Sequence, residues 1–578
     1  MQYDSMDYGV GKKLVNDPLT CVADSLEGFV LSNAGVKLLK GTHIVVREDL
    51  NIFKKQKKVS LIAGGGSGHE PAHIGYIGKG MLTAAVCGDI FASPSSLAIL
   101  SAIRACANDA GVLLIVKNYT GDRLHFGRAV ELAKSEGINV EMIVVGEDCA
   151  ILSEDKNAGR RGLCGTILIH KIAGAMAEEG KTIDEIHKFL QDSILAMGTI
   201  SVSLSSCSIP GKPCNFVVGK DVVEFGLGIH GEPGAAQIKL ESTHNLVRKM
   251  IDHMKSKYLE LTQGTCVILI VNNLGALSNL ELSIVAKETF NYLESLNVSI
   301  IRSYVGSFVT SLDMVGVSLT IMISNPERLS YLDLTTNAAA WPKSGFINTD
   351  IEMDHCMQFD KTLEIYEPSG IGLKLTQCCV AACKTLQDNA ELLNELDRHG
   401  GDGDTGTTFA QGANAILKKL LSEKEVLIPV NSPKDFFAAI AIELDNHMGG
   451  SSGALLSLLM TGISCGLKET YQLVDFISAF KNGIELMKKY GGAEEGDRTM
   501  LDALCPAWHA LNILALSDIT VKAVMKQAAE ASRTGSNNTI EMNAKSGRAS
   551  YVAKTRLAHP DPGAVAVALV FEAIEKSL

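Results

Sequence analysis

The sequence predicts a multidomain protein in which an α/β half, built as two lobes with mainly parallel sheet, is followed by an all-α half. Three observations predict this architecture. Short β-branched runs alternate with longer helical stretches up to about residue 324, which is typical of parallel strands joined by helices. From about residue 375 onward the strand signals vanish and apolar residues recur at helical spacing. The length of 578 residues also suits about three or four structural units.

The strands expected in the first half are short, apolar and often followed by glycine or a polar turn. Continuous apolar strands of this kind indicate a sheet covered on both faces. A stretch rich in serine and glycine, residues 198–234, is predicted to separate the two lobes. The expected strands are Val59–Ala63, Val112–Val116, Glu141–Val145, Cys266–Val271, Ser299–Tyr304 and Val317–Ile323.

The second half contains long patterns with apolar residues at helical spacing, which predict a helical bundle. We expect an N-terminal extension over residues 1–9, the α/β domain over 10–342, a linker over 343–374 and the all-α domain over 375–578. The expected helices are Gln377–Leu396, Thr407–Leu421, Lys434–Asn446, Gly453–Leu467, Leu473–Lys489 and Gly563–Ser577.

Composition excludes several classes of protein. With 46% hydrophobic and 20% charged residues the chain is neither disordered nor fibrous. The net charge of −12 argues against a broad electrostatic grip on nucleic acid. The chain starts without the apolar core of a signal peptide, has no CxxC pair, and its longest uncharged apolar run is too short to span a membrane. We therefore expect a cytoplasmic protein with reduced cysteines and no membrane partner.

The first glycine-rich segment follows a predicted strand. Val59–Ala63 runs into Gly-Gly-Gly-Ser-Gly-His-Glu-Pro at residues 64–71. Glycines at such a place let a ligand approach the backbone, whose amides can hold oxygens. The segment is not a dinucleotide fingerprint, because His69 stands where the third glycine should fall. A tight strand-to-helix turn that binds nothing would explain the same residues.

Two further segments of the α/β half place polar side chains beside glycines. The predicted strand Val112–Val116 runs into Lys117 and Asp122, at the place where open α/β sheets bind ligands. His230 lies among the glycines of 226–234 with little local side-chain cover. A strand end that merely faces water, and a structural histidine, remain the alternatives.

The strongest local signal is a cluster of acidic residues in the second half. Asp397, Asp402 and Asp404 fall within eight residues, interleaved with glycines, between two apolar helices. Such a cluster repels itself unless a cation lies in it. It is not an EF-hand loop, because no glutamate stands at the twelfth position counted from any of the three. The cluster suits Mg²⁺ with phosphates, and a solvated acidic turn is the alternative.

Three other segments, 448–454, 491–500 and 561–563, offer amides, hydroxyls and one cation at helix ends. Each alone is more typical of a helix-capping turn, but together with the aspartates they favour a nucleotide site. The string Gly449-x-Ser451-x-Gly453 matches the serine-hydrolase elbow, yet a helix is expected before it instead of a strand. No GxxxxGK[ST] occurs, so ATP would not be held by a P-loop.

These segments, in this order, resemble those of the dihydroxyacetone kinase family. The matching strings are GGGSGHEP at 64–71, KNYTGDR at 117–123, GLGIHGE at 226–232, LDRHGGDGDTGTT at 396–408, MGGSSGA at 448–454 and GDRTMLD at 496–502. The resemblance covers the chain apart from its first dozen residues and the linker. It is closest to the single-chain, ATP-dependent animal members. It implies phosphorylation of dihydroxyacetone and glyceraldehyde, with a second activity that splits FAD into AMP and riboflavin cyclic 4′,5′-phosphate.

The resemblance implies that the α/β half is the substrate-binding domain, and it implies a role for each matching residue there. His230 would add to the ketone carbonyl and hold the substrate as a hemiaminal, and His69 and Asp122 would act as an acid–base pair. A covalent bond to the carbonyl carbon would reject polyols, which contacts alone discriminate poorly. The remaining pocket residues would be Gly66, Ser67, Gly68 and Lys117.

For the all-α half, the resemblance implies nucleotide binding. Asp397, Asp402 and Asp404 would hold two Mg²⁺ that bridge the ATP phosphates. The FAD-splitting activity could also use Mn²⁺ or Co²⁺. The partners implied are dihydroxyacetone, glyceraldehyde, ATP, FAD and a second copy of the chain in a homodimer. The residues expected to cradle ATP are Thr405, Gly406, Thr407, Thr408, Ser451, Ser452, Gly491, Thr499, Met500, Asp561, Pro562 and Gly563.

A non-catalytic regulatory or adaptor protein that retains the kinase fold is the competing hypothesis. The acidic cluster and His230 argue against it, because an adaptor needs no self-repelling carboxylates.

Overall fold

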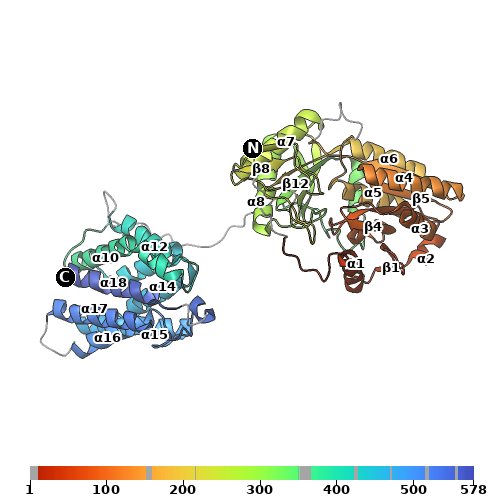
Figure 1. The fold of residues 1–578 in the computed structure, drawn as a ribbon. Coiled ribbons are helices and arrows are strands. Elements are labelled where there is room, and N and C mark those ends of the chain that lie inside the picture. The colour runs from red at the N-terminus through yellow and green to blue at the C-terminus, as the bar shows by residue number, and fades with distance from the viewer. Residues whose placement is uncertain are drawn as a thin grey trace, which may run out of the picture. The chain divides into compact units, whose positions relative to one another are not determined.

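The computed structural model describes residues 11–150, 159–214, 216–348, 350–351, 366–421, 427–468, 471–514, 520–552 and 557–578. The chain divides into two compact units, residues 1–353 and 354–578, whose elements are labelled in Figure 1. The expected N-terminal extension, and residues 349 and 352–365 of the expected linker, lie outside the described residues. The domain boundaries drawn from the sequence stay predictions.

The first sheet of the α/β unit has the strand order β1-β2-β4-β3-β5-β6. Strands β4, β3, β5 and β6 pair in parallel, whereas β1 and β2 are antiparallel additions at one edge. Helices α3 (Ser96–Cys106) and α4 (Thr120–Ser135) cover one face and share an apolar core with it. The other elements are α1 (Cys21–Ser32), β1 (Val36–Leu38), β2 (Ile44–Arg47), α2 (Leu50–Lys55), β3 (Ser60–Ser67), the 3₁₀ turn η1 (Ile74–Tyr76), β4 (Ala84–Ile90), β5 (Val112–Lys117) and β6 (Val140–Val145).

The second sheet has the order β11-β10-β12-β7-β8-β9. Helices α7 (Thr243–Lys257) and α8 (Asn279–Ser295) pack on one face of it. The remaining elements of this lobe are β7 (Met197–Ser203), β8 (Val222–Phe225), β9 (Ala236–Lys239), β10 (Cys266–Asn273), β11 (Ser299–Gly306), β12 (Gly316–Ile323) and α9 (Pro326–Asp333).

The α/β half with two lobes is confirmed, but the expectation of mainly parallel sheet is wrong for the second lobe. There only β10 and β11 pair in parallel, and the other neighbouring pairs are antiparallel. Strand β12 follows β11 without an intervening helix, so the chain returns in the opposite direction. Apolar strands result from burial on both faces, which an antiparallel sheet between two layers also produces.

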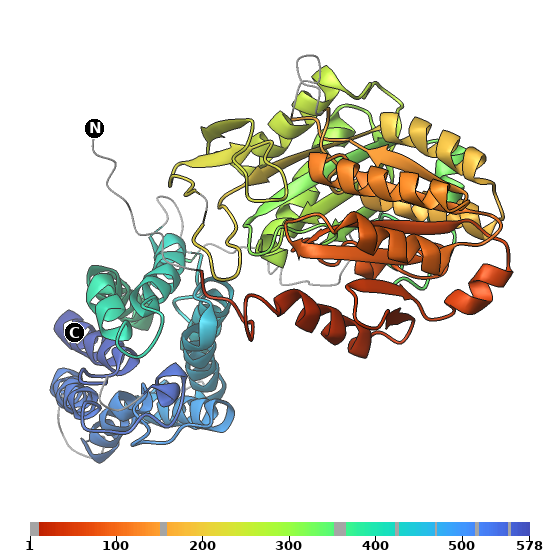
Figure 2. The same ribbon diagram turned by 45° about the vertical axis from the view of Figure 1, so that its right-hand side comes forward.

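One apolar core joins the two lobes. Helices α5 (Thr166–Glu178) and α6 (Ile183–Leu195) lie against the face of the first sheet opposite to α3 and α4, as Figures 1 and 2 show. The same cluster of buried side chains contains Leu113 from β5, Leu168 from α5 and Ile270 from β10. Twelve of the thirteen residues of α5 are buried, so this helix is an interior layer shared by both lobes.

The second unit is helical in its described residues, and its helices close into a ring. Helices α10, α12, α13, α14, α15, α16, α17 and α18 each contact the next one, and α18 returns to α10. The bounds are α10 (Ile371–Asp388), α11 (Ala390–Asp397), α12 (Thr405–Leu420), α13 (Pro433–His447), α14 (Gly450–Gly466), α15 (Leu473–Gly491), α16 (Leu501–Leu514), α17 (Val521–Asn538), the 3₁₀ turn η3 (Arg548–Tyr551) and α18 (Pro562–Ser577).

The all-α second half is confirmed, although the sequence analysis missed some of its elements. The single helix expected over Gln377–Leu396 is two helices, α10 and α11, which meet at Asn389. Helices α16 and α17 were not expected, because α16 contains Pro506 and α17 is rich in small and polar residues. Among the described residues, no helix is both long and apolar enough to cross a membrane.

A buried carboxyl links the two sheets. The Oε1 atom of Glu147, just after β6, accepts the Leu163 amide at 2.9 Å and lies 3.5 Å from the Thr199 hydroxyl of β7. The backbone carbonyl of Glu147 also accepts the Thr199 amide at 2.8 Å. Burial raises the pKa of Glu147 to about 7, because a charge is poorly solvated there.

We predict that Glu147→Gln removes a pH-dependent loss of stability. In the unfolded chain this carboxyl ionises near its ordinary pKa of 4.5, whereas in the folded chain it keeps its proton up to about pH 7. The folded wild type therefore loses stability as the pH rises through this window, and glutamine does not titrate. Urea unfolding should find the variant more stable than wild type by about 1–3 kcal/mol at pH 8, with no gain at pH 4.5. Glu131→Gln, on the exposed face of α4, is the control; an identical pH dependence in wild type and Glu147→Gln would contradict the prediction.

Candidate functional sites

The first candidate site lies where three neighbouring strands of the first sheet end. Strands β3 and β5 are neighbours, and the chain continues from β3 to β4 on one side but from β5 to β6 on the other. Connections therefore leave these two strand ends in opposite directions, as at the ligand sites of open α/β sheets. A cavity of about 470 Å³ opens there. Its lining consists of Gly66, Phe91, Ala92, Ser93, Tyr119, Thr120, Gly121, Asp122, His125 and His230.

His69 is held in one tautomer beside this cavity. Its Nδ1 lies 2.8 Å from the backbone carbonyl of Thr310, and a carbonyl only accepts, so Nδ1 carries the hydrogen. The lone pair is therefore on Nε2, which has no hydrogen-bond partner within the described residues. Burial and the nearby Lys117 hold the pKa of His69 well below its ordinary value. His69 is thus a neutral imidazole with an available acceptor nitrogen.

His230 is enclosed by aromatic rings at the same cavity. Its ring centroid lies 4.9 Å from that of His69, 5.4 Å from Phe91 and 4.5 Å from Tyr119, each in an edge-on arrangement. Burial lowers the pKa of His230 to about 4, against the opposing effect of Glu232. The imidazole is therefore neutral at physiological pH, which leaves a lone pair for a nucleophilic or acceptor role.

Asp122 and Lys117 face each other across Gly65. A methyl group added to Gly65 would lie 3.4 Å from Lys117 Nζ and 3.5 Å from Asp122 Oδ2. Burial raises the pKa of Asp122, whose Oδ1 accepts a short hydrogen bond from the Ser93 hydroxyl, and Lys117 acts against the rise. Burial lowers the pKa of Lys117, which is almost wholly enclosed and lies 3.2 Å from His73 Nε2.

The site residues predicted for the α/β half lie close together in the structure. Some of them line the cavity, and others are buried next to it. Gly66, Asp122 and His230 line the cavity, while His69 and Lys117 lie behind it. The Ser67 hydroxyl donates to the Gly88 carbonyl at 2.7 Å. The Gly68 amide donates to the Glu70 carboxylate, and its φ of +100° favours glycine.

Several residues of this site were missed by the sequence analysis. Phe91, which stacks on His69, and Ser93 follow β4, a strand that was not expected because Gly88 and Asp89 interrupt its apolar run. Thr310 acts through its backbone carbonyl from 241 residues away, and no local pattern reports such a contact. Tyr119 stands in the recognised segment 117–123, and its ring next to His230 could have been proposed from that position.

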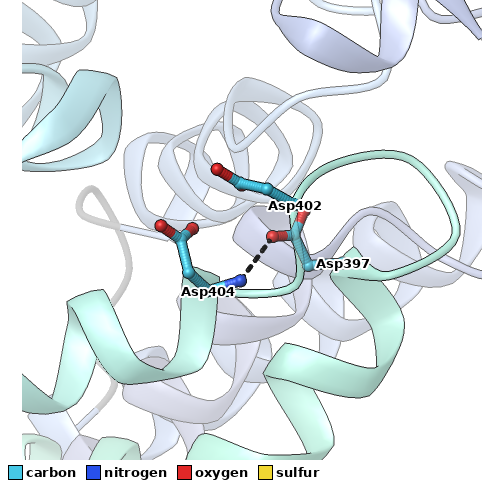
Figure 3. A group of neighbouring side chains, drawn as sticks. All are labelled: Asp397, Asp402 and Asp404. Carbon is cyan, nitrogen blue, oxygen red and sulfur yellow. Dashed lines mark hydrogen bonds between the residues drawn. The ribbon is translucent and has the colours of Figure 1, made fainter. Parts of the chain in front are cut away.

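The second candidate site is a cavity of about 390 Å³ in the helical unit. Asp397 ends α11 and is buried. Its Oδ2 accepts the amides of Gly403 at 3.0 Å, Asp404 at 3.1 Å and Thr405 at 3.3 Å, and Figure 3 shows the bond from Asp404. The loop before α12 is therefore wrapped around one carboxylate, and the φ of +78° at Gly403 allows the turn.

The three aspartates form a set of oxygen donors suitable for a cation. One carboxylate oxygen from each of Asp397, Asp402 and Asp404 lies within 4.8 Å of the others. Asp402 and Asp404 are exposed, which leaves their oxygens accessible from the cavity that all three line. Hard cations such as Mg²⁺ prefer carboxylate oxygens, so the donor set fits the ion expected from the sequence.

Most residues expected to cradle a nucleotide line this cavity, and three do not. Gly406 is buried against Ala390, whose carbonyl would lie 1.8 Å from an added methyl. The amide and hydroxyl of Thr407 bond with the side chain of Asn394, and Gly491 is exposed at the end of α15. The expected residues that line the cavity are Thr405, Thr408, Ser451, Ser452, Thr499, Met500, Asp561, Pro562 and Gly563.

Two buried side chains, Arg498 and Asp502, shape the cavity. The sequence analysis counted Arg498 only as the cation of segment 491–500 and gave Asp502 no role. Arg498 has a φ of +63°, lines the cavity and donates to the His559 carbonyl at 2.8 Å. Asp502 accepts the amides of Gly496 at 2.5 Å and Thr499 at 2.7 Å, so it closes the loop that carries Arg498. Both residues belong to segment 496–502, which was recognised from the sequence. Their roles in holding the loop are evident only from its conformation.

Comparisons with known proteins agree with this arrangement. A Dak1 domain matches residues 27–340, and a DAK2 domain matches residues 399–576. The triokinase/FMN cyclase of Homo sapiens is 44% identical over 573 residues, which cover 97% of this chain and 98% of that protein. The dihydroxyacetone kinase of Citrobacter freundii is 39% identical over 96% of this chain and 97% of its own length. A crystal structure of the C. freundii enzyme with AMP-PNP and Mg²⁺ covers 98% of this chain and 100% of that chain, with a TM-score of 0.70 and 37% identity.

We predict that Gly401→Ala weakens cation binding in the helical unit. The added methyl would lie 2.3 Å from Asp397 Oδ1, so the carboxylate must move and lose its bonds to the loop amides. Titration calorimetry of Mg²⁺ with a non-hydrolysable ATP analogue should show an affinity at least about tenfold lower. Gly400→Ala is the matched control, because its methyl would meet the flexible end of Leu557 at 3.0 Å and no carboxylate. Equal affinities in wild type and Gly401→Ala would contradict the prediction.

Proposed function

The chain belongs to the dihydroxyacetone kinase family, and from this premise we propose that it transfers the terminal phosphate of ATP to dihydroxyacetone and to glyceraldehyde. The observation that carries the proposal is the pair of sites in one chain. A pocket with neutral His69 and His230 lies in the α/β unit, and a carboxylate cluster with a nucleotide-sized cavity lies in the helical unit. The closely similar relatives named above are kinases of this kind.

His230 would bind the carbonyl substrate covalently. Its neutral imidazole would attack the carbonyl carbon, the ring would lose its N–H proton, and the carbonyl oxygen would gain a proton, so that an N–H bond adds across C=O. The pKa of about 4 for His230 supports this role, because a protonated ring has no lone pair to donate. Such an adduct selects for aldehydes and ketones over polyols of the same size.

Asp122 and His69 would act on the substrate hydroxyl. The Nε2 lone pair of His69 and the carboxyl of Asp122 are available acceptors beside His230, and burial raises the pKa of Asp122 above its ordinary range. An acceptor within hydrogen-bond reach can take the hydroxyl proton as the phosphate is transferred. Lys117 would donate to the substrate from the end of β5, while Gly66, Ser67 and Gly68 would shape the pocket wall.

The helical unit would bind ATP with Mg²⁺. Asp397, Asp402 and Asp404 would hold two ions, and the relative solved with AMP-PNP and Mg²⁺ supports this assignment. Bound Mg²⁺ neutralises charge on the transferring phosphate. The helix start at Ser451 and Ser452 would offer amides and hydroxyls to the phosphates. Gly406, Thr407 and Gly491, which lie off the cavity, would contribute through the loop conformation alone.

We further propose that the helical unit splits FAD into AMP and riboflavin cyclic 4′,5′-phosphate. The support is the name of the human relative, triokinase/FMN cyclase, together with a cavity able to take the AMP part of either nucleotide. Mn²⁺ or Co²⁺ would replace Mg²⁺ at the same carboxylates for this activity. The homodimer and the cytoplasmic location expected from the sequence stay predictions. The cysteines within the described residues are free thiols.

The kinase activity predicts distinct losses from two substitutions. With Mg-ATP and dihydroxyacetone, wild type should form ADP, whereas His230→Ala and Asp404→Ala should each lose at least about a hundredfold in kcat/KM. The measurement is a coupled ADP assay, repeated with glyceraldehyde and with glycerol, which should not react. His244→Ala and Asp445→Ala, both exposed in the same units, are the controls. Full activity of His230→Ala would remove the covalent role, and turnover absent from wild type would favour the regulatory alternative.

The lyase activity predicts a different pattern from the same variants. Wild type with FAD and Mn²⁺ or Mg²⁺ should release AMP, Asp404→Ala should not, and His230→Ala should keep the rate because it lies in the other unit. Chromatography of AMP and the cyclic flavin product checks this. A wild type that leaves FAD intact would refute the second activity without affecting the first.

A further inference from the structure

The partly buried guanidinium of Arg161 holds the loop that carries His230. The Nη2 atom of Arg161 donates to the Gly226 carbonyl at 2.7 Å, and its Nη1 donates to Glu232 Oε1 at 3.1 Å. Arg161 Nε donates to Asp148 Oδ2 at 2.6 Å. The side chain of Asp148 is 1% exposed and also accepts the Ala150 amide at 2.8 Å. Arg161 is thereby fixed by the first lobe and bonds both ends of a loop of the second lobe.

The contact extends to His230 itself. While Glu232 Oε1 accepts from Arg161, its Oε2 accepts the backbone amide of His230 at 2.8 Å. Arg161 is therefore separated from the backbone of His230 by one carboxylate. These charge-assisted hydrogen bonds fix the position of the His230 backbone, from which the imidazole side chain extends.

Gly228 lies so close to the Arg161–Glu232 ion pair that no side chain could be accommodated at this position without moving the pair. A methyl group added there would lie 1.6 Å from Glu232 Oε1 and 2.7 Å from Arg161 Nη1. Glycine is thus required at 228 by the close approach of the ion pair.

We propose that Arg161 is a positioning residue for His230, which presets the nucleophilic ring for attack on the substrate carbonyl; this inference rests on the proposed covalent role of His230. The loop is rich in glycine, at 226, 228, 231 and 234, and glycines lose more conformational freedom on ordering than other residues. Attack requires the reacting atoms to be about 3–3.5 Å apart and aligned. A loop ordered before the substrate arrives meets this requirement without a further entropic cost.

The neighbouring Arg160 provides a matched control. It is also a partly buried arginine near Asp148, but its hydrogen bonds go to the carbonyls of Asp148, Glu147 and Met197 and to Cys149 Sγ, and none goes to the His230 loop. A lysine at either position keeps the charge and loses the planar fork. Arg160→Lys therefore measures how much adduct occupancy and activity change when any arginine in this region is replaced by lysine.

The experiment measures the adduct and the kinetics in the full-length protein. Binding of dihydroxyacetone labelled with ¹³C at the carbonyl is followed by NMR, because adduct formation converts the carbonyl carbon into a tetrahedral one. Arg161→Lys should lower adduct occupancy at a fixed ketone concentration and reduce kcat/KM about a hundredfold, mainly through KM. Arg160→Lys should keep wild-type occupancy. Gly228→Ala should reproduce the effect of Arg161→Lys, and the double variant should lose little more than either one.

The outcomes separate this inference from the proposed function. Wild-type occupancy and KM in Arg161→Lys, with an adduct present in wild type, would overturn the positioning role alone. Equal losses in Arg160→Lys and Arg161→Lys would also overturn it, since the effect would then be general to the region. No adduct in wild type would overturn the covalent role and this inference together. If Arg161→Lys does not fold, Gly228→Ala disturbs the same ion pair from the loop side and decides the question by the same readings.

Discussion

The second sheet packs against the same helices that cover the inner face of the first sheet, and the geometry of the candidate site in the α/β unit depends on that packing. Because side chains of β5, α5 and β10 share one core, the ends of β3, β4 and β5 are brought against loops of the other lobe. The bond from His69 to the Thr310 carbonyl and the bonds from Arg161 to Gly226 and Glu232 all cross between the lobes. Apolar burial thus sets the distances at which the polar groups meet.

In the helical unit, the main constraint is that three carboxylates, those of Asp397, Asp402 and Asp404, lie close together. The side chain of Asp397 accepts three backbone amides of the loop that begins α12. The same amides fix the loop that presents Asp402 and Asp404 to the cavity. One carboxylate therefore organises the loop, and the other two remain accessible. Their mutual repulsion is a cost to folding, which a cation bound as we propose would relieve.

The segments that form each site could be identified from the sequence. The contacts that side chains make within a site, with residues distant in the chain, could not. The glycine run at 64–68 and the aspartates at 397–404 are local patterns. The structure places Gly66 of the run at one cavity and all three aspartates at the other. Thr310, Arg161 and Ser93 act on residues far away in sequence, so their partners are chosen by tertiary packing. The mainly antiparallel pairing of the second sheet was not predicted either, since burial on both faces produces apolar strands in either direction. Asn389 ends α10 through its backbone conformation, which periodicity does not register.

The near-complete burial of α5 has a consequence for how the α/β unit folds. Twelve of its thirteen residues are buried, the polar His170 and Lys171 among them, so the helix has no face that contacts solvent in the folded unit. Its contacts with β3 and β5 on one side and α9 on the other connect segments distant in the chain, which raises the contact order and slows folding. The two lobes are therefore one cooperative folding unit. A fragment ending between them would expose the helix, and ribosomal synthesis must pass beyond residue 333 before that surface can be covered.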